Sequence, residues 1–392
     1  MFIEIVVNFC HLLQVLEINM KKKYNWIMVS ALTIIPILGI FGTFIYSCYN
    51  GVIWQEPVLM ILGWWISGMG ITIGYHRLFA HRSFQAHPVV QFIAMLCGSS
   101  ALQNTILKWS SDHRLHHKEL DTEVDPYSIT KGFFHAHIGW IIEDKPPAIN
   151  GVNDLKKNPI VMFQYKYYWL IAIGLSFVFP LIIGSFYGRP LGGLLWGGFL
   201  RVTLVHHFTF FINSLCHFVG KRPFELNTSA RDSWWVAYLT FGEGFHNFHH
   251  KFEWDYRNGI RWYDFDPGKW MISILSFFRL TSNIKKVEDY KILNARYNGL
   301  LEKIKISYPA ISDKMASLYS NQVNDIQEKA SKVYSKWTDF ELNFKDLKSK
   351  GFLDKFEKAR MIHKRKILKM EYSSFLNGLS IILVSIRNSN YI

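Results

Sequence analysis

The sequence is poor in cysteine and in charged residues. Its 392 residues include only four cysteines, Cys10, Cys48, Cys97 and Cys216, which are widely spaced and form no C-x-x-C pair. A disulfide scaffold or a thiolate metal site is therefore not expected. Charged residues make up 19 % of the chain, below the roughly 25 % of an average soluble domain. This composition argues against an ordinary soluble enzyme.

Several familiar sequence signals are also missing. No G-x-G-x-x-G follows a predicted strand, which excludes a nicotinamide-binding oxidoreductase of the usual kind. No base-reading module or stacking platform is present, so we expect no nucleic-acid partner. No short apolar region ends in a small-residue cleavage site, so we expect no cleavable secretory signal.

Apolar residues are abundant and concentrated. They make up 49 % of the chain, aromatic residues make up 16 %, and the net charge is +14. Residues 281–392 hold 21 Lys and Arg against 12 Asp and Glu. A basic C-terminal region on an apolar protein indicates contact with an anionic membrane surface.

Four apolar segments approach the ~20 residues that a helix needs to cross a bilayer. They fall at about 26–48, 57–76, 167–187 and 191–213. Short turns join them in two hairpins, and a fifth apolar stretch, 88–107, is predicted to be interfacial or re-entrant. Lysines and arginines gather before the first span and between the hairpins, which predicts that both termini and the middle loop are cytoplasmic.

The predicted fold is therefore all-α and integral to the membrane. Four transmembrane helices in two hairpins are expected to carry a helical cap on the cytosolic side. We expect a cytosolic N-terminal segment at 1–25, the transmembrane domain with its cap at 26–285, and basic amphipathic helices at 286–392. Residues 1–19 precede Met20 and three lysines, and are either a short amphipathic helix or an over-extended reading frame.

The histidines form three clusters on the predicted cytoplasmic face. The clusters are His76 with His81, then His113, His116 and His117, then His246, His249 and His250. The pattern H-x-x-H-H puts three imidazoles on one face of a helix. A pair five residues apart diverges by about 140° on an ideal α-helix, so the first pair predicts a helix end. Imidazole suits iron, copper, zinc and nickel, and eight ligands are enough for two ions of a redox metal.

The sequence resembles the integral-membrane fatty acid desaturases, and among them the Δ9 acyl-CoA desaturases of the stearoyl-CoA type. The likeness covers about 50–285. It includes the three histidine boxes, Gly74, Trp109, Asp112, and the segment from Asn213 to His217. It implies an O₂-dependent enzyme that introduces a cis double bond, at Δ9, into a long-chain acyl-CoA at a di-iron centre. It also implies that His217 is a ninth iron ligand and that Asn213 contacts the site through water.

The resemblance implies substrate-binding residues as well. By position, Gln103, Trp109 and Thr209 match residues that line the bend of an apolar tunnel, and Trp64 on the second span is expected to close its far end. Asn104, Asp112 and Lys145 match residues that meet coenzyme A. Ser111 and Asp144 stand where the animal acyl-CoA members carry basic residues. Acyl-CoA is therefore the expected substrate, with a phospholipid-bound or carrier-protein-bound acyl chain as the alternative.

Two other functions stay open at this stage. One is a hydroxylase or acyl-lipid desaturase of the same membrane di-iron group. The other is a membrane metal transporter or sensor, which would need a polar path through spans that are apolar apart from Arg201, His206 and His207. His87-Pro88 lacks the glycines of a cytochrome b5 haem motif, so electrons are expected from a separate donor such as cytochrome b5 or a ferredoxin-like protein. The expected membrane is the bacterial inner membrane or the endoplasmic reticulum.

Overall fold

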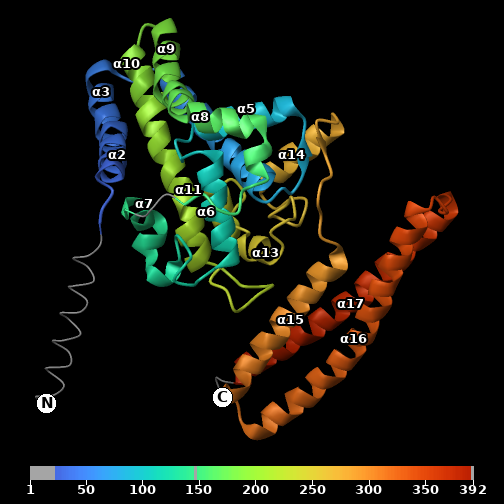
Figure 1. Ribbon diagram of the computed structural model, residues 1–392. Helices are drawn as coiled ribbons and strands as arrows, with labels where there is room; N and C mark the ends of the chain where they lie inside the picture. Colours follow the sequence, from blue (N-terminus) through green and yellow to red (C-terminus); the bar gives the residue numbers. More distant parts are fainter. Residues whose placement is uncertain (1–22, 145–147, 390–392) are drawn as a thin grey trace, which may run out of the picture. The chain divides into compact units, whose positions relative to one another are not determined.

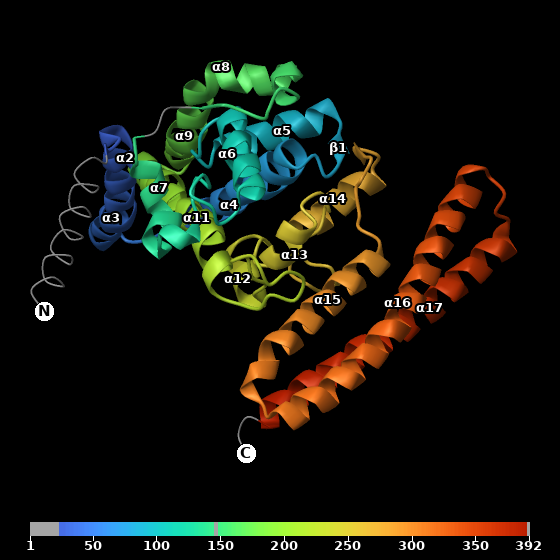
Figure 2. The same cartoon turned by 60° about the horizontal axis from the view of Figure 1, so that its bottom comes forward.

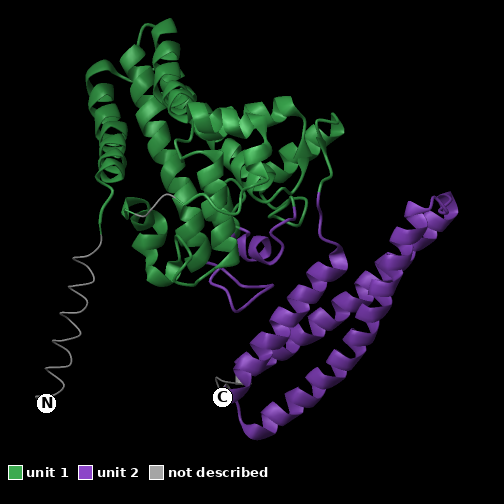
Figure 3. Ribbon diagram, viewed as in Figure 1, with its two compact units in different colours: residues 1–218, 234–244, 256–284 green, residues 219–233, 245–255, 285–392 purple. Residues whose placement is uncertain are grey.

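The structure is a computed structural model that describes residues 23–144 and 148–389 (Figure 1). The chain divides into two compact units, coloured separately in Figure 3. Unit 1 consists of residues up to 218, 234–244 and 256–284, and unit 2 of residues 219–233, 245–255 and 285–392. Most of the segment expected at 1–25 lies outside the described residues.

The mainly helical fold expected from the sequence is confirmed. Within the described residues, the named strands are β1 (Gln85–Ala86) and β2 (Thr281–Ser282). They pair antiparallel, with Gln85 opposite Ser282. Everything else with regular structure is helical.

Four long helices form the frame of unit 1, and each combines α-helical and π-helical turns. They are Trp26–Asn50 (α2 Trp26–Pro36, η1 Ile37–Gly42, α3 Thr43–Asn50), Gln55–Ala80 (α4 Gln55–Met69, η2 Gly70–Ala80), Pro159–Phe186 (α8 Pro159–Ile173, η6 Gly174–Val178, α9 Phe179–Phe186) and 190–218 (α10 Pro190–Gly193, η7 Leu194–Leu200, α11 Arg201–Phe218). Loops at 51–54 and 187–189 join the first pair and the second pair. These tight connections place consecutive helices next to each other.

Shorter elements fill the rest of unit 1. They are α5 (Pro88–Ser99), α6 (Ile106–Lys118), η3 (Ile129–Lys131), η4 (His135–Gly139), α7 (Trp140–Ile142), η5 (Leu155–Lys157), α12 (Trp234–Leu239) and α14 (Pro267–Phe277). Both α5 and α6 pack against η2 (Figure 2). Glycine makes the first of these contacts possible, because a Cβ atom on Gly70 would lie 2.2 Å from the backbone nitrogen of Gly98. Thr105 starts α6 by accepting a hydrogen bond from the Lys108 amide at 3.2 Å.

Four helices are long and apolar enough to cross a membrane by length and composition: Trp26–Asn50, Gln55–Ala80, Pro159–Phe186 and Lys355–Asn388. Three of them contain segments predicted as spans. The fourth predicted span, 191–213, is helical but is not one of the four, since Arg201, His206 and His207 lower its hydropathy. The 12-residue helix α5 is about 18 Å long, too short for a ~30 Å hydrocarbon core.

Unit 2 contains α13 (His246–Lys251), α15 (Asp289–Ser307), η8 (Tyr308–Ala310), α16 (Asp313–Ser349) and α17 (Lys355–Ser389). The helices α15, α16 and α17 share a core around Trp337, Tyr372 and Leu379. The residues of α17 in that core come from 368–386, the most apolar part of the helix. The composition of α17 is therefore apolar enough for a membrane span. In unit 2, however, one apolar side of α17 packs against the helices α15 and α16, which carry many charged residues.

Candidate metal centre and apolar cavity

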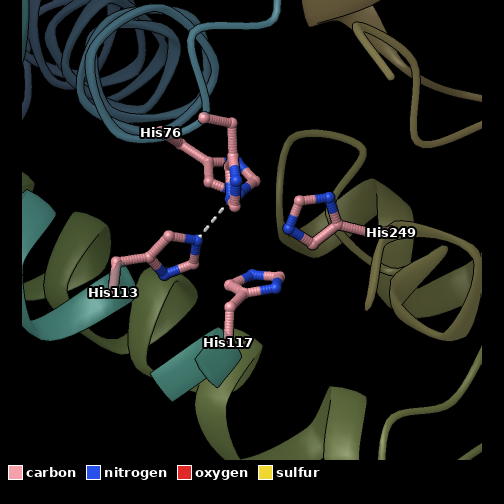
Figure 4. A group of neighbouring side chains, drawn as sticks. His76, His113, His117 and His249 are labelled. Atoms are coloured by element: carbon pink, nitrogen blue, oxygen red, sulfur yellow. Dashed lines mark hydrogen bonds between the residues drawn. The ribbon is translucent and has the colours of Figure 1, made fainter. Parts of the chain in front are cut away.

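Four histidines of unit 1 converge on one point. His76 lies in η2, His81 directly follows it, and His113 and His117 lie on α6. Each of these four residues has one ring nitrogen that lies within 4.8 Å of the corresponding nitrogen of every other residue in the group. The Nε2 atoms of His81 and His113 are 2.8 Å apart. Figure 4 shows the rings of His76, His113 and His117 facing one another.

A π-type turn brings His76 and His81 together. The amide of His81 donates to the carbonyl of His76 at 3.0 Å, which is the i→i+5 bond of a π-helix. The two ring centroids are 4.7 Å apart. The sequence correctly placed this pair at a helix end, and the wide turn explains how both rings reach the same side.

A second pair of histidines lies beside this group. His116 of α6 and His217 of α11 offer ring nitrogens within 4.8 Å of each other, and their ring centroids are 5.2 Å apart. In unit 2, the Nε2 atoms of His246 and His250 on α13 are 3.0 Å apart. Asn247 holds the start of α13, because its side chain accepts from the Phe224 amide and donates to the Ala230 carbonyl.

Buried acidic and phenolic groups hold the far side of the imidazoles. His76 Nδ1 lies 3.1 Å from Glu243, His116 Nδ1 lies 2.9 Å from Asp125, and His113 Nδ1 lies 3.2 Å from the Tyr127 hydroxyl. A proton on Nδ1 that is donated to a carboxylate leaves the lone pair of Nε2 facing the centre. This arrangement is the one that metal-binding histidines require.

The residues around Glu243 keep its carboxylate ionised. Burial raises the pKa of Glu243, but the hydrogen bond from His76, the charge of Arg77 and the hydrogen bond from Thr72 outweigh burial and hold the pKa well below its usual range. Arg77 lies 3.2 Å from Glu243 and 2.8 Å from Asp266. Thr72 also donates to Glu243. The carboxylate is thus fixed in place behind His76.

The electrostatics of the site favour neutral imidazoles. Burial, together with the neighbouring His117 and His76, lowers the pKa of both His81 and His113 well below the usual value. Since a metal binds the unprotonated ring, the site suits a metal at neutral pH.

A cavity of about 1220 Å³ opens beside the first group, larger than the roughly 300–1,000 Å³ of most small-molecule sites. His76 and His113 both line it. Most of the predicted substrate-binding residues also line the cavity: Gln103, Asn104, Trp109, Asp112 and Thr209. Asn213, which is predicted to contact the site through water, lines it as well. Trp109 stacks on His113 with ring centroids 4.8 Å apart, and Gln103 donates to the Thr209 hydroxyl.

A model of the fatty acid desaturase family matches residues 51–273, more than half of the chain. The chain belongs to the fatty acid desaturase family. This membership agrees with the resemblance stated from the histidine boxes. The match contains all nine histidines proposed as ligands and ends before helices α15, α16 and α17.

Curated desaturases are similar to this chain over most of its length. The "Probable acyl-CoA desaturase" of Schizosaccharomyces pombe is 39 % identical over 278 residues, 70 % of this chain and 57 % of the relative. "Acyl-CoA desaturase 1" of Saccharomyces cerevisiae is 34 % identical over 290 residues, 73 % of this chain and 56 % of the relative. The "sn-1 stearoyl-lipid 9-desaturase" of Anabaena variabilis is 34 % identical over 270 residues, 68 % of this chain and 95 % of the relative. The match thus spans a little over half of the two yeast proteins.

Two of the substrate residues expected from the sequence, Trp64 and Lys145, differ from the others. Trp64 does not line the cavity, whereas Phe241 does. The Phe241 ring packs on Trp64 with centroids 4.7 Å apart, and a Cβ atom on Gly68 would lie 2.1 Å from its Cζ atom. Phe241 thus fills the space that Gly68 leaves open and separates Trp64 from the cavity. Lys145 lies outside the described residues.

Sequence reasoning missed Glu243, Asp125 and Phe241. Glu243 stands three residues before the third histidine box, and Asp125 stands eight residues after the second. An acidic residue so near a histidine box is the signal that could have found both. Nothing in the sequence marks Phe241, which adopts a left-handed backbone with φ of 54° and is fully buried.

Other histidines of unit 1 have partners of their own. His137 lies 3.1 Å from His207 and 3.0 Å from the Ser214 hydroxyl. His206 Nε2 lies 2.9 Å from the Ala101 carbonyl oxygen. Neither candidate metal group in the described part of the chain includes these residues.

Proposed function

We propose that this chain is an O₂-dependent desaturase that introduces a cis double bond, at Δ9, into a long-chain acyl-CoA at a di-iron centre. The observation that carries the proposal is the meeting of imidazole nitrogens at the wall of an apolar cavity, with carboxylates behind two of the rings. Family membership supports the reaction class. The names of the two yeast relatives, both acyl-CoA desaturases, support coenzyme A as the carrier.

Nine histidines would hold the two iron ions. Within unit 1, His76, His81, His113 and His117 would belong to one ion, and His116 and His217 to the other. His246, His249 and His250 of α13 would supply the remaining ligands. Figure 4 shows the rings of His76, His113 and His117. Bound iron would supply the O₂-dependent removal of hydrogen from an unactivated alkyl chain, which no side chain can perform. Glu243 and Asp125 would keep the Nδ1 protons of His76 and His116 in place, so that both rings present Nε2 to the metal.

The cavity would bind the acyl chain. Polar residues such as Lys108 and Asp112 line it together with apolar ones such as Ile71 and Phe241, which suits an amphipathic ligand. Gly68 precedes His76 by eight residues, about 12 Å along the helix. We assign the end of the cavity near Gly68 to the methyl end of the chain. Phe241 would close this end, and Trp64 would support its ring.

Acyl-lipid desaturation is the second candidate. Ser111 stands where the resemblance implies a cation for coenzyme A, and its hydroxyl is used in a mutual pair of hydrogen bonds with the backbone of Asn150. The relative from Anabaena variabilis is named for a lipid-linked stearoyl substrate. Lys108, 2.6 Å from Asp112, would still offer a cation at the cavity wall.

We also propose the topology and the partners expected from the sequence. The helix pairs 26–80 and 159–218 would form two transmembrane hairpins with the metal centre on the cytoplasmic side, in the bacterial inner membrane or the endoplasmic reticulum. Electrons would come from a separate donor such as cytochrome b5 or a ferredoxin-like protein. The basic surface of the chain, with a net charge of +14, suits an acidic donor.

The test supplies both carriers to the purified chain. The protein is placed in liposomes with a reducing system, O₂, and stearoyl groups presented either as stearoyl-CoA or within a phospholipid. We expect a monounsaturated product from stearoyl-CoA and none from a His249→Ala variant. Product from the phospholipid alone would establish the second candidate. Hydroxylated chains would contradict both.

A further inference from the structure

Helix α17 has two apolar sides. At about 100° per residue, Leu368, Tyr372, Leu376, Leu379 and Leu383 fall on one side, where they are buried in the core of unit 2. A second set falls on the opposite side, within an arc of roughly 60°. Its members are Phe356, Ile367, Met370 and Ile381, which are 87 %, 50 %, 64 % and 67 % exposed.

This outer stripe explains an apparent conflict in the helix. The stretch Lys355–Asn388 is apolar enough to be a candidate span, yet one side of it is committed to α15 and α16 (Figure 1). A helix on the surface of a soluble bundle normally carries polar residues on its outer side. Between its large residues, and within the same arc, the stripe of α17 carries His363 and Ser374 instead. The middle of the outer side therefore carries no Lys, Arg, Asp or Glu.

Cations flank the stripe on both sides. Residues 355–370 include seven Lys and Arg and one Glu. Arg360 and Lys364 lie on one side of the stripe, and Lys355 and Lys366 lie on the other. Within the described residues, Lys355, Arg360 and Lys366 form no ion pair, so their charges are available to a partner.

We propose that this outer side of α17, defined by Phe356, Ile367, Met370 and Ile381, docks on the surface of an anionic lipid bilayer. A line of apolar side chains bordered by cations is the pattern of a helix that lies in a membrane interface. Each cation near such a surface strengthens the attraction to anionic lipid. A second copy of the same face would bring like charges together.

The rest of the chain also favours a bilayer as the partner. The same chain carries three other helices that are long and apolar enough to cross it. Docking is then an intramolecular event with a high effective concentration, so a weak interface is sufficient. The proposal does not depend on the desaturase reaction, and it gives a role to helices that lie beyond the family match.

The experiment uses a photo-crosslinking residue in the full-length protein. p-Benzoylphenylalanine replaces Phe356 or Ile367, and Gln322, an exposed residue of α16, serves as the matched control position. Each protein is reconstituted in liposomes of phosphatidylcholine alone or with phosphatidylglycerol, irradiated, and analysed by mass spectrometry. We expect lipid adducts at 356 and 367 that are at least roughly threefold stronger with phosphatidylglycerol, and none above background at 322.

A charge variant tests the electrostatic part. Lys355→Gln, Arg360→Gln and Lys366→Gln together change only exposed side chains, so the fold is preserved. We expect this variant to lose the gain that phosphatidylglycerol gives. A crosslink to a second copy of the chain or to another protein, or no lipid adduct in either membrane, would overturn the proposal.

Discussion

His76 and Glu243 meet across two distant segments of unit 1, with Nδ1 and Oε2 3.1 Å apart. Glu243 also contacts Arg77 and Thr72, so one carboxylate joins the helix that bears the first histidine box to the loop before the third. The contact fixes which nitrogen of His76 faces the centre. It therefore links the fold of unit 1 to its capacity to hold a metal.

The first prediction concerns that contact. Glu243→Gln keeps the size of the side chain but removes the charge that holds the proton on His76 Nδ1. We expect iron affinity to fall by roughly 10–100-fold, measured by elemental analysis after dialysis against a chelator. Glu56→Gln is the matched control, because Glu56 is also buried and paired with an arginine, Arg189 at 3.1 Å, far from the histidines. Equal iron retention in both variants would contradict the role of Glu243.

The second prediction concerns Asp125 and the second iron ion. Asp125→Asn weakens the hold on His116, which we assign to the second ion. The iron content should fall from two towards one per chain as the chelator concentration rises, while Glu243→Gln affects the other ion. If Asp125→Asn releases both ions together at the lowest chelator concentration, the two-group assignment is wrong.

Phe241 is predicted to set the length of the acyl chain. Phe241→Ala, or the milder Phe241→Leu, should raise the ratio of longer to shorter products at least roughly tenfold, since one methylene is worth that much in a fitted apolar pocket. Trp64→Ala should have a smaller effect, because Trp64 acts through Phe241. Chain-length profiling of the products measures both, and an unchanged profile in Phe241→Ala would refute the assignment.

A double substitution tests whether Gly68 and Phe241 share the same space. Gly68→Ala forces its Cβ atom against the Phe241 ring, so we expect lower yield of folded protein or lower activity. Combining it with Phe241→Ala should restore part of what is lost, as a double-mutant cycle would show. Strict additivity of the two changes would mean that the two residues do not share this space.

A pH-dependent contribution is predicted in unit 2. Partial burial raises the pKa of Glu288, but hydrogen bonds from Lys345 and Lys291 outweigh it and lower the pKa from 4.5 to about 2. The stabilisation is therefore present above about pH 4.5 and is lost as the pH falls towards 2. Glu288→Gln should be less stable than the wild type at pH 6, by under about 1 kcal/mol, and equally stable near pH 2. Thermal unfolding at both pH values measures the difference, and a constant difference would contradict the assignment.

The sequence predicted the helical frame and the histidine clusters because both are short-range patterns. Run lengths of apolar residues located three of the four long apolar helices. The helix predicted at 191–213 is present, but Arg201 and two histidines interrupt its apolar run and keep it out of the four most apolar long helices. The run lengths did not predict α17 as the fourth, because lysines and arginines separate its two apolar sides. The period of the apolar residues describes one face of a helix at a time, so it predicts an ordinary amphipathic helix for α17 and does not reveal the second apolar face.

The contacts that complete the site lie beyond such patterns. The π-turn that joins His76 to His81 depends on tertiary packing, and Glu243 reaches His76 only in the folded chain. Trp64 was expected at the end of the cavity because it lies at the right height on the second helix. Phe241 lines the cavity and Trp64 does not, and no pattern in the sequence predicts the left-handed backbone of Phe241.

The most direct test of the central claim is the fatty-acid profile of a host that lacks its own desaturase and expresses this chain. The double bond is located in each product by mass spectrometry, and a His249→Ala variant serves as the inactive control. We expect a monounsaturated fatty acid with its double bond at Δ9, present with the wild type and absent with the variant. Folded, iron-loaded protein that yields no unsaturated product with any supplied electron donor would contradict it.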